Sequence, residues 1–237
     1  MRLVARVHNL STAVSRLTEI GSSGVALGED DAREAIGMMP AVFTALAATA
    51  GLDPRPVRAL CTKLRDAGRR SPPWKPTSMR VPGRPQDGAD GNRRLRWLFD
   101  SDHKFYADER TASLVELRYY FQAFSMEGAP ELPARELGEA WEWLTGHPVE
   151  PGQYRDPIQM IDIDLTWCLE DLRRIQSGHL VPLDRGGRHA PDNAFLMLAR
   201  SNQLQGNQTL DELLALMEAI LQRQREMQGP QEPTVPI

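Results

Sequence analysis

The fold of the C-terminal region is decided by residues 177–209, which read SGHLVPLDRGGRHAPDNAFLMLARSNQLQGNQT. Short apolar segments on either side of the paired glycines predict a strand, a glycine-turned loop and a second strand. The following segment 200–206 predicts a short helical turn that ends at glycine. A hairpin packed on such a helix would bring His179 of the first strand to face Asn202 of the helix.

Within this segment, Asn193 follows His179 by fourteen residues, and Asn202 follows nine residues later. The segment also contains a proline three residues after the histidine, the paired glycines and a loop histidine, and it ends with the sequence Ser-Asn-x-x-Gln-Gly. The combination resembles the HNH endonucleases, the ββα-metal group, and it does not extend to residues 1–150. The alternative, a core histidine with ordinary turn and cap asparagines, leaves the joint arrangement unexplained.

Phosphodiester hydrolysis needs an attacking water, a base, and positive charge at the phosphate and the leaving 3′ oxygen. The resemblance implies that His179 is the base and that Asn202 holds one Mg²⁺ or Mn²⁺ ion per active site. It implies that Asn193 ties the loop 186–192 to the histidine strand and so orients the ring. An arginine is expected at the phosphate, and the sequence offers several near the motif: Arg174, Arg185, Arg188 and Arg200.

One position departs from many HNH enzymes, which have an aspartate directly before the base histidine. Here that position is Gly178, so a single asparagine would hold the ion together with water and phosphate oxygens. A second ligand could come from Asp162, Asp164 or Asp184. Alternating Ile and Asp at 161–164 equally describes a half-buried strand with its acids in water.

Cysteine usage argues against a structural zinc site or a disulfide framework, because Cys61 and Cys168 are isolated and far apart. The sequence shows no signal peptide and no apolar run of membrane length, so we expect a cytoplasmic protein without a membrane partner.

A second motif lies in residues 43–64 and resembles a helix-turn-helix. Ala47 is small where two helices would cross, Gly51 supplies the turn, and Asp53 followed by Pro54 is a typical helix start. A recognition helix would run over residues 54–67, and its outward residues are candidate DNA contacts. Arg188, which lies in the nuclease motif, is a further candidate DNA contact. The candidates on this helix are Arg55, Arg58, Thr62, Lys63 and Arg65. The alternative is an ordinary helical hairpin with a basic solvated face.

Charge is distributed unevenly along the chain, whose formal net charge is −4. Residues 1–96 contain 16 Lys/Arg and 9 Asp/Glu, a net of +7, and the rest contains 12 and 23, a net of −11. Positive charge near the helix-turn-helix favours binding of a polyanion. Much of it lies in residues 69–96, where abundant Pro and Gly predict a linker or a wing.

The remaining sequence is mostly helical in pattern. Apolar spacing predicts helices over 3–20 and 29–37, which with the hairpin would form a three- or four-helix N-terminal unit. Further helices are predicted over 109–126, with one broad apolar face, over 133–144, and from the capping box at Thr209 to about Arg225.

These patterns predict a mostly α protein with a small ββα-metal hairpin, α+β overall. We expect a helix-turn-helix-like DNA-binding domain at 1–68, a basic linker or wing at 69–96, and a nuclease domain at 97–228. The core motif of the nuclease domain would span 175–223, and 229–237 would form a disordered tail.

The resemblance implies a metal-dependent endonuclease acting on double-stranded DNA. A nuclease with its own reading unit resembles a type II restriction endonuclease, many of which are homodimers, so we expect a homodimer from the class alone. Two alternatives remain open: a homing or phage-type nicking endonuclease, and a non-catalytic helix-turn-helix regulator.

Overall fold

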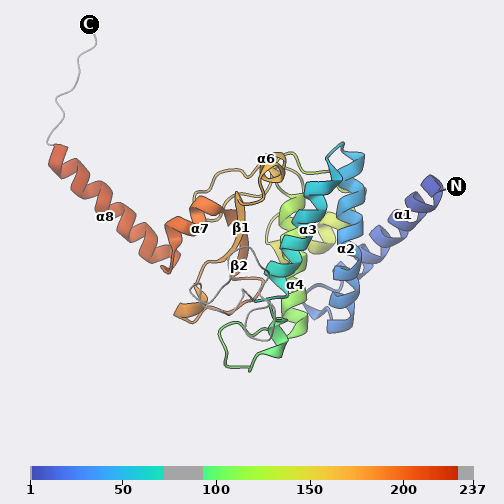
Figure 1. Cartoon of the computed structure of the whole chain (residues 1–237), viewed down its shortest axis with the longest axis horizontal. Helices are drawn as coiled ribbons and strands as arrows, with labels where there is room; N and C mark the ends of the chain where they lie inside the picture. The colour runs from blue at the N-terminus through green and yellow to red at the C-terminus, as the bar shows by residue number, and fades with distance from the viewer. Residues whose placement is uncertain (1, 72–92, 229–237) are drawn as a thin grey trace, which may run out of the picture.

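The structure is a computed structural model that describes residues 2–71 and 93–228, with side chains for 10–71 and 93–227. A two-stranded antiparallel sheet accompanies the helices, so the mostly α prediction is confirmed (Figure 1). The helices and strands are α1 (Arg2–Gly21), α2 (Glu29–Thr49), α3 (Pro54–Gly68), α4 (Glu109–Phe124), α5 (Arg135–Thr145), α6 (Leu165–Glu170), β1 (Ile175–His179), β2 (Ala194–Leu198), α7 (Ala199–Gln205) and α8 (Leu210–Gln228).

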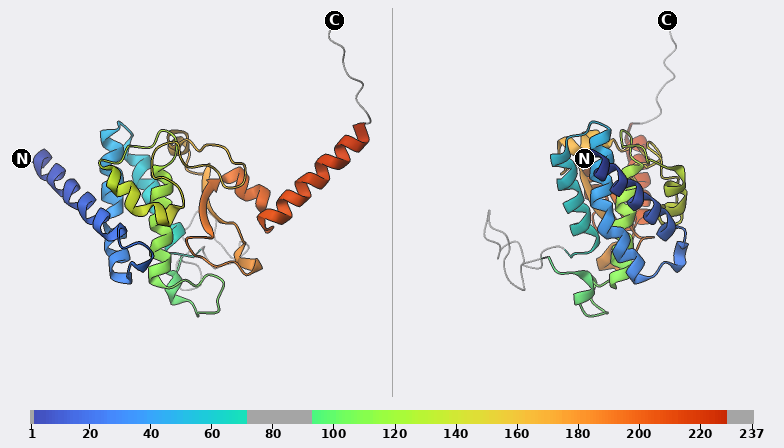
Figure 2. Two further views of the ribbon diagram at one scale, coloured as in Figure 1. Left: turned by 180° about the vertical axis from the view of Figure 1, so that it is seen from behind. Right: turned by 90° about the vertical axis from the view of Figure 1, so that its right-hand side faces the viewer.

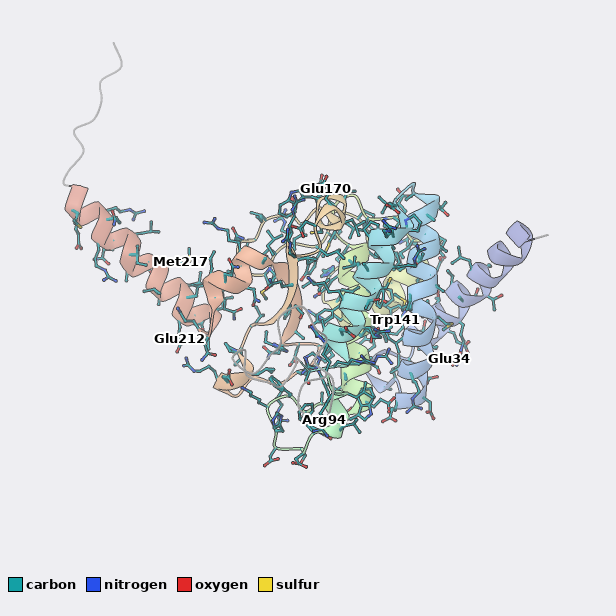
Figure 3. The ribbon with its side chains drawn as sticks, in the orientation of Figure 1. Glu34, Arg94, Trp141, Glu170, Glu212 and Met217 are labelled. Atoms are coloured by element: carbon teal, nitrogen blue, oxygen red, sulfur yellow. The ribbon has the colours of Figure 1, made fainter. Side chains whose placement is uncertain are left out.

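Helix α4 lies at the centre of the molecule. Every residue from Ala112 to Phe124 is buried, because α2, α3, α5 and β2 all pack against this helix. The sequence predicted one apolar face for this helix, whereas the structure buries its whole circumference from Ala112 to Phe124. Trp141 of α5, labelled in Figure 3, lies in the same core, and its Nε1 donates to the carbonyl oxygen of Leu17 at 3.1 Å.

The N-terminal helices form where local signals predict them. Gly51 has a φ of +81° at the turn between α2 and α3. Asp53 then caps α3, since its carboxylate accepts a hydrogen bond from the backbone N–H of Arg55 at 2.9 Å. Helix α2 is longer than predicted and continues through Pro40, so the N-terminal part contains three helices.

One hydrophobic core joins the helices on both sides of the predicted boundary at residue 68. Helix α3 packs on α4, and α1 packs on α5. The ends of the predicted linker also lie side by side: Ser71 N–H donates to Arg94 O at 2.9 Å, and Arg96 N–H donates to Arg69 O at 3.0 Å. The division into a reading unit and a nuclease unit stays a prediction, and the basic positions in 72–92 lie outside the described residues.

Strands β1 and β2 pair in an antiparallel register that places Ile175 opposite Leu198 and His179 opposite Ala194. The free edge of β2 is buried, so its backbone groups need other partners. Side chains supply them: Leu196 N–H donates to Gln122 Oε1 at 3.0 Å, and Leu198 N–H donates to Asp156 Oδ2 at 2.8 Å. A two-stranded hairpin is thereby held by α4 and by the loop around residue 156.

The capping box of α8 is present, because Thr209 N–H donates to Glu212 Oε2 at 3.0 Å and Glu212 N–H donates to Thr209 Oγ1 at 3.3 Å. Beyond its first turn this helix runs away from the body of the protein (Figures 1 and 2). None of the helices in the described residues has the length and apolar character needed to cross a membrane.

Candidate active site

His179 ends strand β1 and its ring is the first member of a hydrogen-bonded relay. Its Nε2 lies 3.0 Å from Nδ1 of His189, which sits in the loop between the strands. Nε2 of His189 lies 2.6 Å from the carbonyl oxygen of Gly68, the last residue of α3. The relay therefore connects the hairpin to the C-terminal end of α3.

The hydrogen atoms of this relay follow from the fixed acceptor at its end. A carbonyl oxygen only accepts, so Nε2 of His189 carries the proton and Nδ1 of a neutral ring accepts. Nε2–H of His179 then donates to that Nδ1. The assignment leaves Nδ1 of His179 as an unprotonated nitrogen, which is the state that a general base requires.

Both rings are held neutral by their surroundings. Burial, and secondarily the guanidinium of Arg96, lowers the pKa of His179 to about 4. The same two causes hold the pKa of His189 well below its usual value, and His189 is only 1% exposed. Neither imidazole is protonated at neutral pH.

Arg96 places a buried cation behind the two histidines. It is 3% exposed, and burial lowers its pKa to about 10, so it remains charged at neutral pH. Its Nε donates to Gly68 O at 3.0 Å, and its two Nη groups donate to Ala67 O and Phe105 O, each at 3.3 Å. A cation suits this place because the carbonyls at the C-terminal end of α3 carry partial negative charge.

Asn202 of α7 lies against the histidine strand. Its Nδ2 donates to Gln176 Oε1 at 2.7 Å, which fixes the direction of the amide. The oxygen Oδ1 then lies 3.2 Å from the point where a Cβ on Gly178 would stand, and Met197 Cε lies 2.5 Å from the same point. An aspartate at position 178 would therefore displace the side chains of Met197 and Asn202.

Asn193 bridges the loop and the strand. Its Oδ1 accepts from Val181 N–H at 2.7 Å, and its Nδ2 donates to Val181 O at 2.9 Å and to Arg188 O at 2.8 Å. The paired glycines make this closure sterically feasible. Gly186 has a φ of +85°, and a Cβ on Gly187 would stand 1.9 Å from Val181 O.

The three aspartates considered as second metal ligands have other partners. Asp162 pairs with Arg155 at 3.0 Å, and Asp184 pairs with Lys104 at 2.5 Å. Asp164 caps α6, where its carboxylate accepts from Thr166 N–H at 2.7 Å. Among the described residues, no cluster of three or more His, Cys, Asp or Glu side chains forms a metal cage. An ion held by the amide oxygen of Asn202 alone would need water and phosphate oxygens at its other positions, which is a coordination that Mg²⁺ accepts.

Of the four arginines near the motif, two are committed elsewhere. Arg174 pairs with Glu170 at 2.8 Å, and Arg185 pairs with Glu212 at 2.7 Å. Arg188 and Arg200 are exposed, and within the described part of the chain their side chains form no hydrogen bond or ion pair. These two guanidinium groups are available to a phosphate.

The candidate DNA contacts on α3 differ in accessibility. Arg55, Arg58 and Thr62 are exposed. Lys63 is half-buried, and its Nζ donates to Leu172 O at 2.5 Å, so this ammonium serves an internal contact. Arg65 is half-buried beside Asp66, and with Arg58 and Thr62 it lines an apolar cavity of about 850 Å³ next to α2.

Sequence reasoning included the loop histidine in the motif but assigned it no role. The relay partner Gly68 lies 121 residues from His189 in sequence, and no local pattern links the two. Arg96 and Gln176 carried no signal either. Gln205 lies within the motif, but the sequence indicated no role for it. Its Nε2 ties α7 to the strand by donating to His179 O and Leu180 O, each at 2.9 Å.

No family model and no curated protein matches this chain. Among solved structures, a type II restriction endonuclease is similar, with a TM-score of 0.44 and 24% sequence identity. The similarity covers 52% of this chain and 55% of the other, so the chain spans about half the length of that structure.

Substitution of His189 by glutamine is expected to change how stability depends on pH. The folded protein keeps His189 neutral, whereas the imidazole of the unfolded chain binds a proton below pH ~6.5. The free energy of unfolding of the wild type therefore falls by up to about 1.4 kcal/mol for each pH unit below ~6.5 because of His189. Glutamine preserves a donor and an acceptor but does not titrate. Urea unfolding of both proteins between pH 5 and pH 8 should show that their free energies of unfolding converge, or cross in favour of the variant, as the pH falls. Parallel curves would contradict the assignment.

Proposed function

We propose that this chain is a metal-dependent DNA endonuclease of the HNH type that cuts both strands at a specific sequence. The observation that carries the proposal is the state of His179, a neutral imidazole whose Nε2 is tied through His189 to Gly68 O and whose Nδ1 is left unprotonated. His179 directly follows Gly178, and Oδ1 of Asn202 lies 3.2 Å from the position that a Cβ on Gly178 would take.

In the proposed reaction, Nδ1 of His179 accepts a proton from the water that attacks the phosphorus. The relay keeps the ring in place during this transfer, and the resulting imidazolium still donates through Nε2 to His189. Asn202 would hold one Mg²⁺ or Mn²⁺ ion, and such an ion supplies positive charge at the phosphate and at the leaving 3′ oxygen. Arg188 and Arg200 are the proposed phosphate contacts, because their guanidinium groups are exposed and uncommitted.

Sequence recognition is proposed for the first turns of α3. Arg55, Arg58 and Thr62 are exposed there, and arginine and threonine hydrogen-bond to base edges and phosphates. The C-terminal end of the same helix receives the hydrogen bond from His189. A helix that touches DNA at one end and the relay at the other would hold the reading surface and the catalytic base in one rigid unit.

Incubation of plasmid and phage DNA with the protein tests this proposal. We expect discrete fragments with Mg²⁺, none with EDTA, and a loss of cleavage of about 100-fold or more in Asn202→Ala, because the metal ligand is removed. Gln203→Ala is the matched control, since this exposed residue is the next one on α7 and should retain activity.

The product pattern separates the alternatives. A smear would keep the chemistry and exclude site specificity, and plasmid that is only nicked would indicate cleavage of one strand. DNA that stays intact on every substrate while still being bound would favour the non-catalytic regulator.

A further inference from the structure

A cavity of about 850 Å³ lies between helices α2 and α3, which pack side by side against α4 (Figure 1). Small and apolar residues of α1 and α2 form much of its wall: Leu10, Ala13, Pro40, Ala41, Ala45 and Ala48. Its volume is within the range of about 300–1,000 Å³ that is typical of ligand sites. The described residues that line it include none of His179, His189 and Asn202, so the cavity is distinct from the candidate active site.

A buried carboxylate with an unsatisfied oxygen lines this cavity. The side chain of Glu116, on α4, is 1% exposed. Its Oε2 accepts from Nε of Arg69 at 2.5 Å, whereas its Oε1 is buried and has no hydrogen-bond partner among the described residues. Burial raises the pKa of this carboxyl group to about 7, although the charge of Arg69 opposes the shift. Buried polar atoms in folded proteins are normally paired, so Oε1 of Glu116 indicates a donor that a ligand brings into the cavity.

The charged side chains around the cavity determine which ligand charge it favours. Three positive side chains and one negative side chain line it: Arg58, Arg65, Arg69 and Glu116. Asp66 offsets part of this positive charge, because its Oδ1 lies 3.5 Å from Nε of Arg65. Arg58 is exposed, and within the described part of the chain its side chain forms no hydrogen bond or ion pair. The positive surplus disfavours a cationic ligand and favours an anionic group at Arg58.

A ligand for this cavity therefore needs three chemical features. It needs a body that packs against an apolar wall, an N–H donor for Oε1 of Glu116, and an anionic group for Arg58. A nucleotide has all three, because its base is a flat ring, the amino group of adenine, cytosine or guanine donates, and its phosphate is anionic. Glutamate accepts from the amino group of cytosine in protein–DNA recognition, and arginine is a common partner of phosphate.

We propose that the cavity between α2 and α3 binds one nucleotide, with the amino group of the base on Glu116 and the phosphate on Arg58. Arg58 and Thr62, two of the residues proposed to read DNA, line the cavity and are exposed. A nucleotide turned out of a duplex on α3 would therefore meet this cavity, as in enzymes that read a base outside the double helix. The DNA source of the nucleotide rests on the proposed function, whereas binding of a free nucleotide does not.

Calorimetric titration of the full chain with dCMP, dAMP, dGMP and dTMP, without metal and at pH 8, tests the site. At this pH Glu116 is mainly ionised and accepts. We expect the amino-bearing nucleotides to bind with dissociation constants on the order of 10–100 μM, as for a ligand of about 20 non-hydrogen atoms. Binding of dTMP, which has no amino group, should be weaker by about tenfold. No binding of any amino-bearing nucleotide, or equal binding of dTMP, would overturn the proposal.

Glu116→Gln reverses the hydrogen-bonding polarity inside the cavity. Because Nε of Arg69 donates to one side-chain atom at position 116, the glutamine oxygen takes that place and its NH₂ group takes the place of Oε1. The preference should therefore change from the amino-bearing dCMP to dTMP, whose ring oxygens accept, by about tenfold in the ratio of dissociation constants. An unchanged preference in a variant that urea unfolding shows to be folded would contradict the contact with Glu116.

Ala45→Trp tests the cavity without changing a charged residue. Ala45 is half-buried on the α2 wall, so an indole at this position would occupy the space proposed for the base and should abolish measurable binding of dCMP. Thr49→Trp is the matched control, because this exposed residue lies on the same helix but does not line the cavity, and it should bind dCMP as the wild type does. Equal affinities of the two variants would place the nucleotide elsewhere.

Duplexes with 2-aminopurine at successive positions of the cleavage site distinguish DNA from free nucleotides as the source. The fluorescence of this base rises when it leaves the stack, so a rise at one position that is lost in Ala45→Trp indicates a nucleotide of DNA in the cavity. No rise at any position, with dCMP still bound, assigns the site to free nucleotides. Binding of dCMP without DNA cleavage would reject the nuclease and keep this site, and cleavage without nucleotide binding would do the reverse.

Discussion

Replacing His179 with alanine should lower the single-turnover rate of DNA cleavage by a factor of about 10³, within the 10²–10⁴ range typical of a general base. The physical reason is the loss of the nitrogen, Nδ1 of His179, that the relay leaves unprotonated. The rate is best measured on a short duplex containing the cleavage site, with protein in excess, so that product release does not limit it.

Two measurements make this result specific for the base. Binding of the duplex in EDTA should be unchanged within about twofold, because no DNA contact is assigned to the imidazole. His103→Ala serves as the control substitution of a histidine away from the relay and should cleave at the wild-type rate. A His179→Ala protein within tenfold of the wild-type rate would remove this residue from the mechanism.

Gly68→Ala should lower the free energy of unfolding by about 3 kcal/mol, at the upper end of overpacking effects. A Cβ at this position would stand 2.5 Å from Cβ and 2.7 Å from Cα of Glu116, at the crossing of α3 and α4. Because a backbone atom of a buried helix is in the way, relief requires α3 to move. Thermal or urea unfolding gives the magnitude.

The same substitution should reduce cleavage by more than its effect on stability explains. Gly68 O accepts from both His189 and Arg96, so a shift of α3 would break the relay to His179. Gly37→Ala is the matched control: this exposed glycine lies in the middle of α2, an added Cβ meets nothing within 4 Å, and the change should stabilise the protein by about 0.5–1 kcal/mol. Equal effects of the two substitutions would show that Gly68 is not at a close crossing.

Features set by neighbouring residues could be predicted from the sequence. The cap at Asp53, the turn at Gly51, the capping box at Thr209 and the hairpin around Gly186 each depend on a few consecutive residues, and each is present in the structure. The placement of His179 on a strand and Asn202 on the following helix belongs to this group, because the hairpin and helix are contiguous in sequence.

Features that depend on packing between distant segments could not be predicted. The pattern of α4 indicated one apolar face, yet four elements surround the helix and bury it on every side. Lysine is a residue type expected to contact DNA from the surface of a helix. The packing of α3 instead places Nζ of Lys63 2.5 Å from Leu172 O.

The sequence by itself determined the turns, the helix caps and which residues form the His–Asn–Asn motif, because these features depend on a few consecutive residues. The first strand lies at Ile175–His179, earlier than the predicted segment around 178–182. Only the tertiary structure decided the protonation of His179. That state depends on Gly68 and Arg96, which come from the end of α3 and from the segment before α4, and on burial by the surrounding core. Acidity and tautomer are properties of a ring's surroundings, and those surroundings exist only after the distant helices have packed.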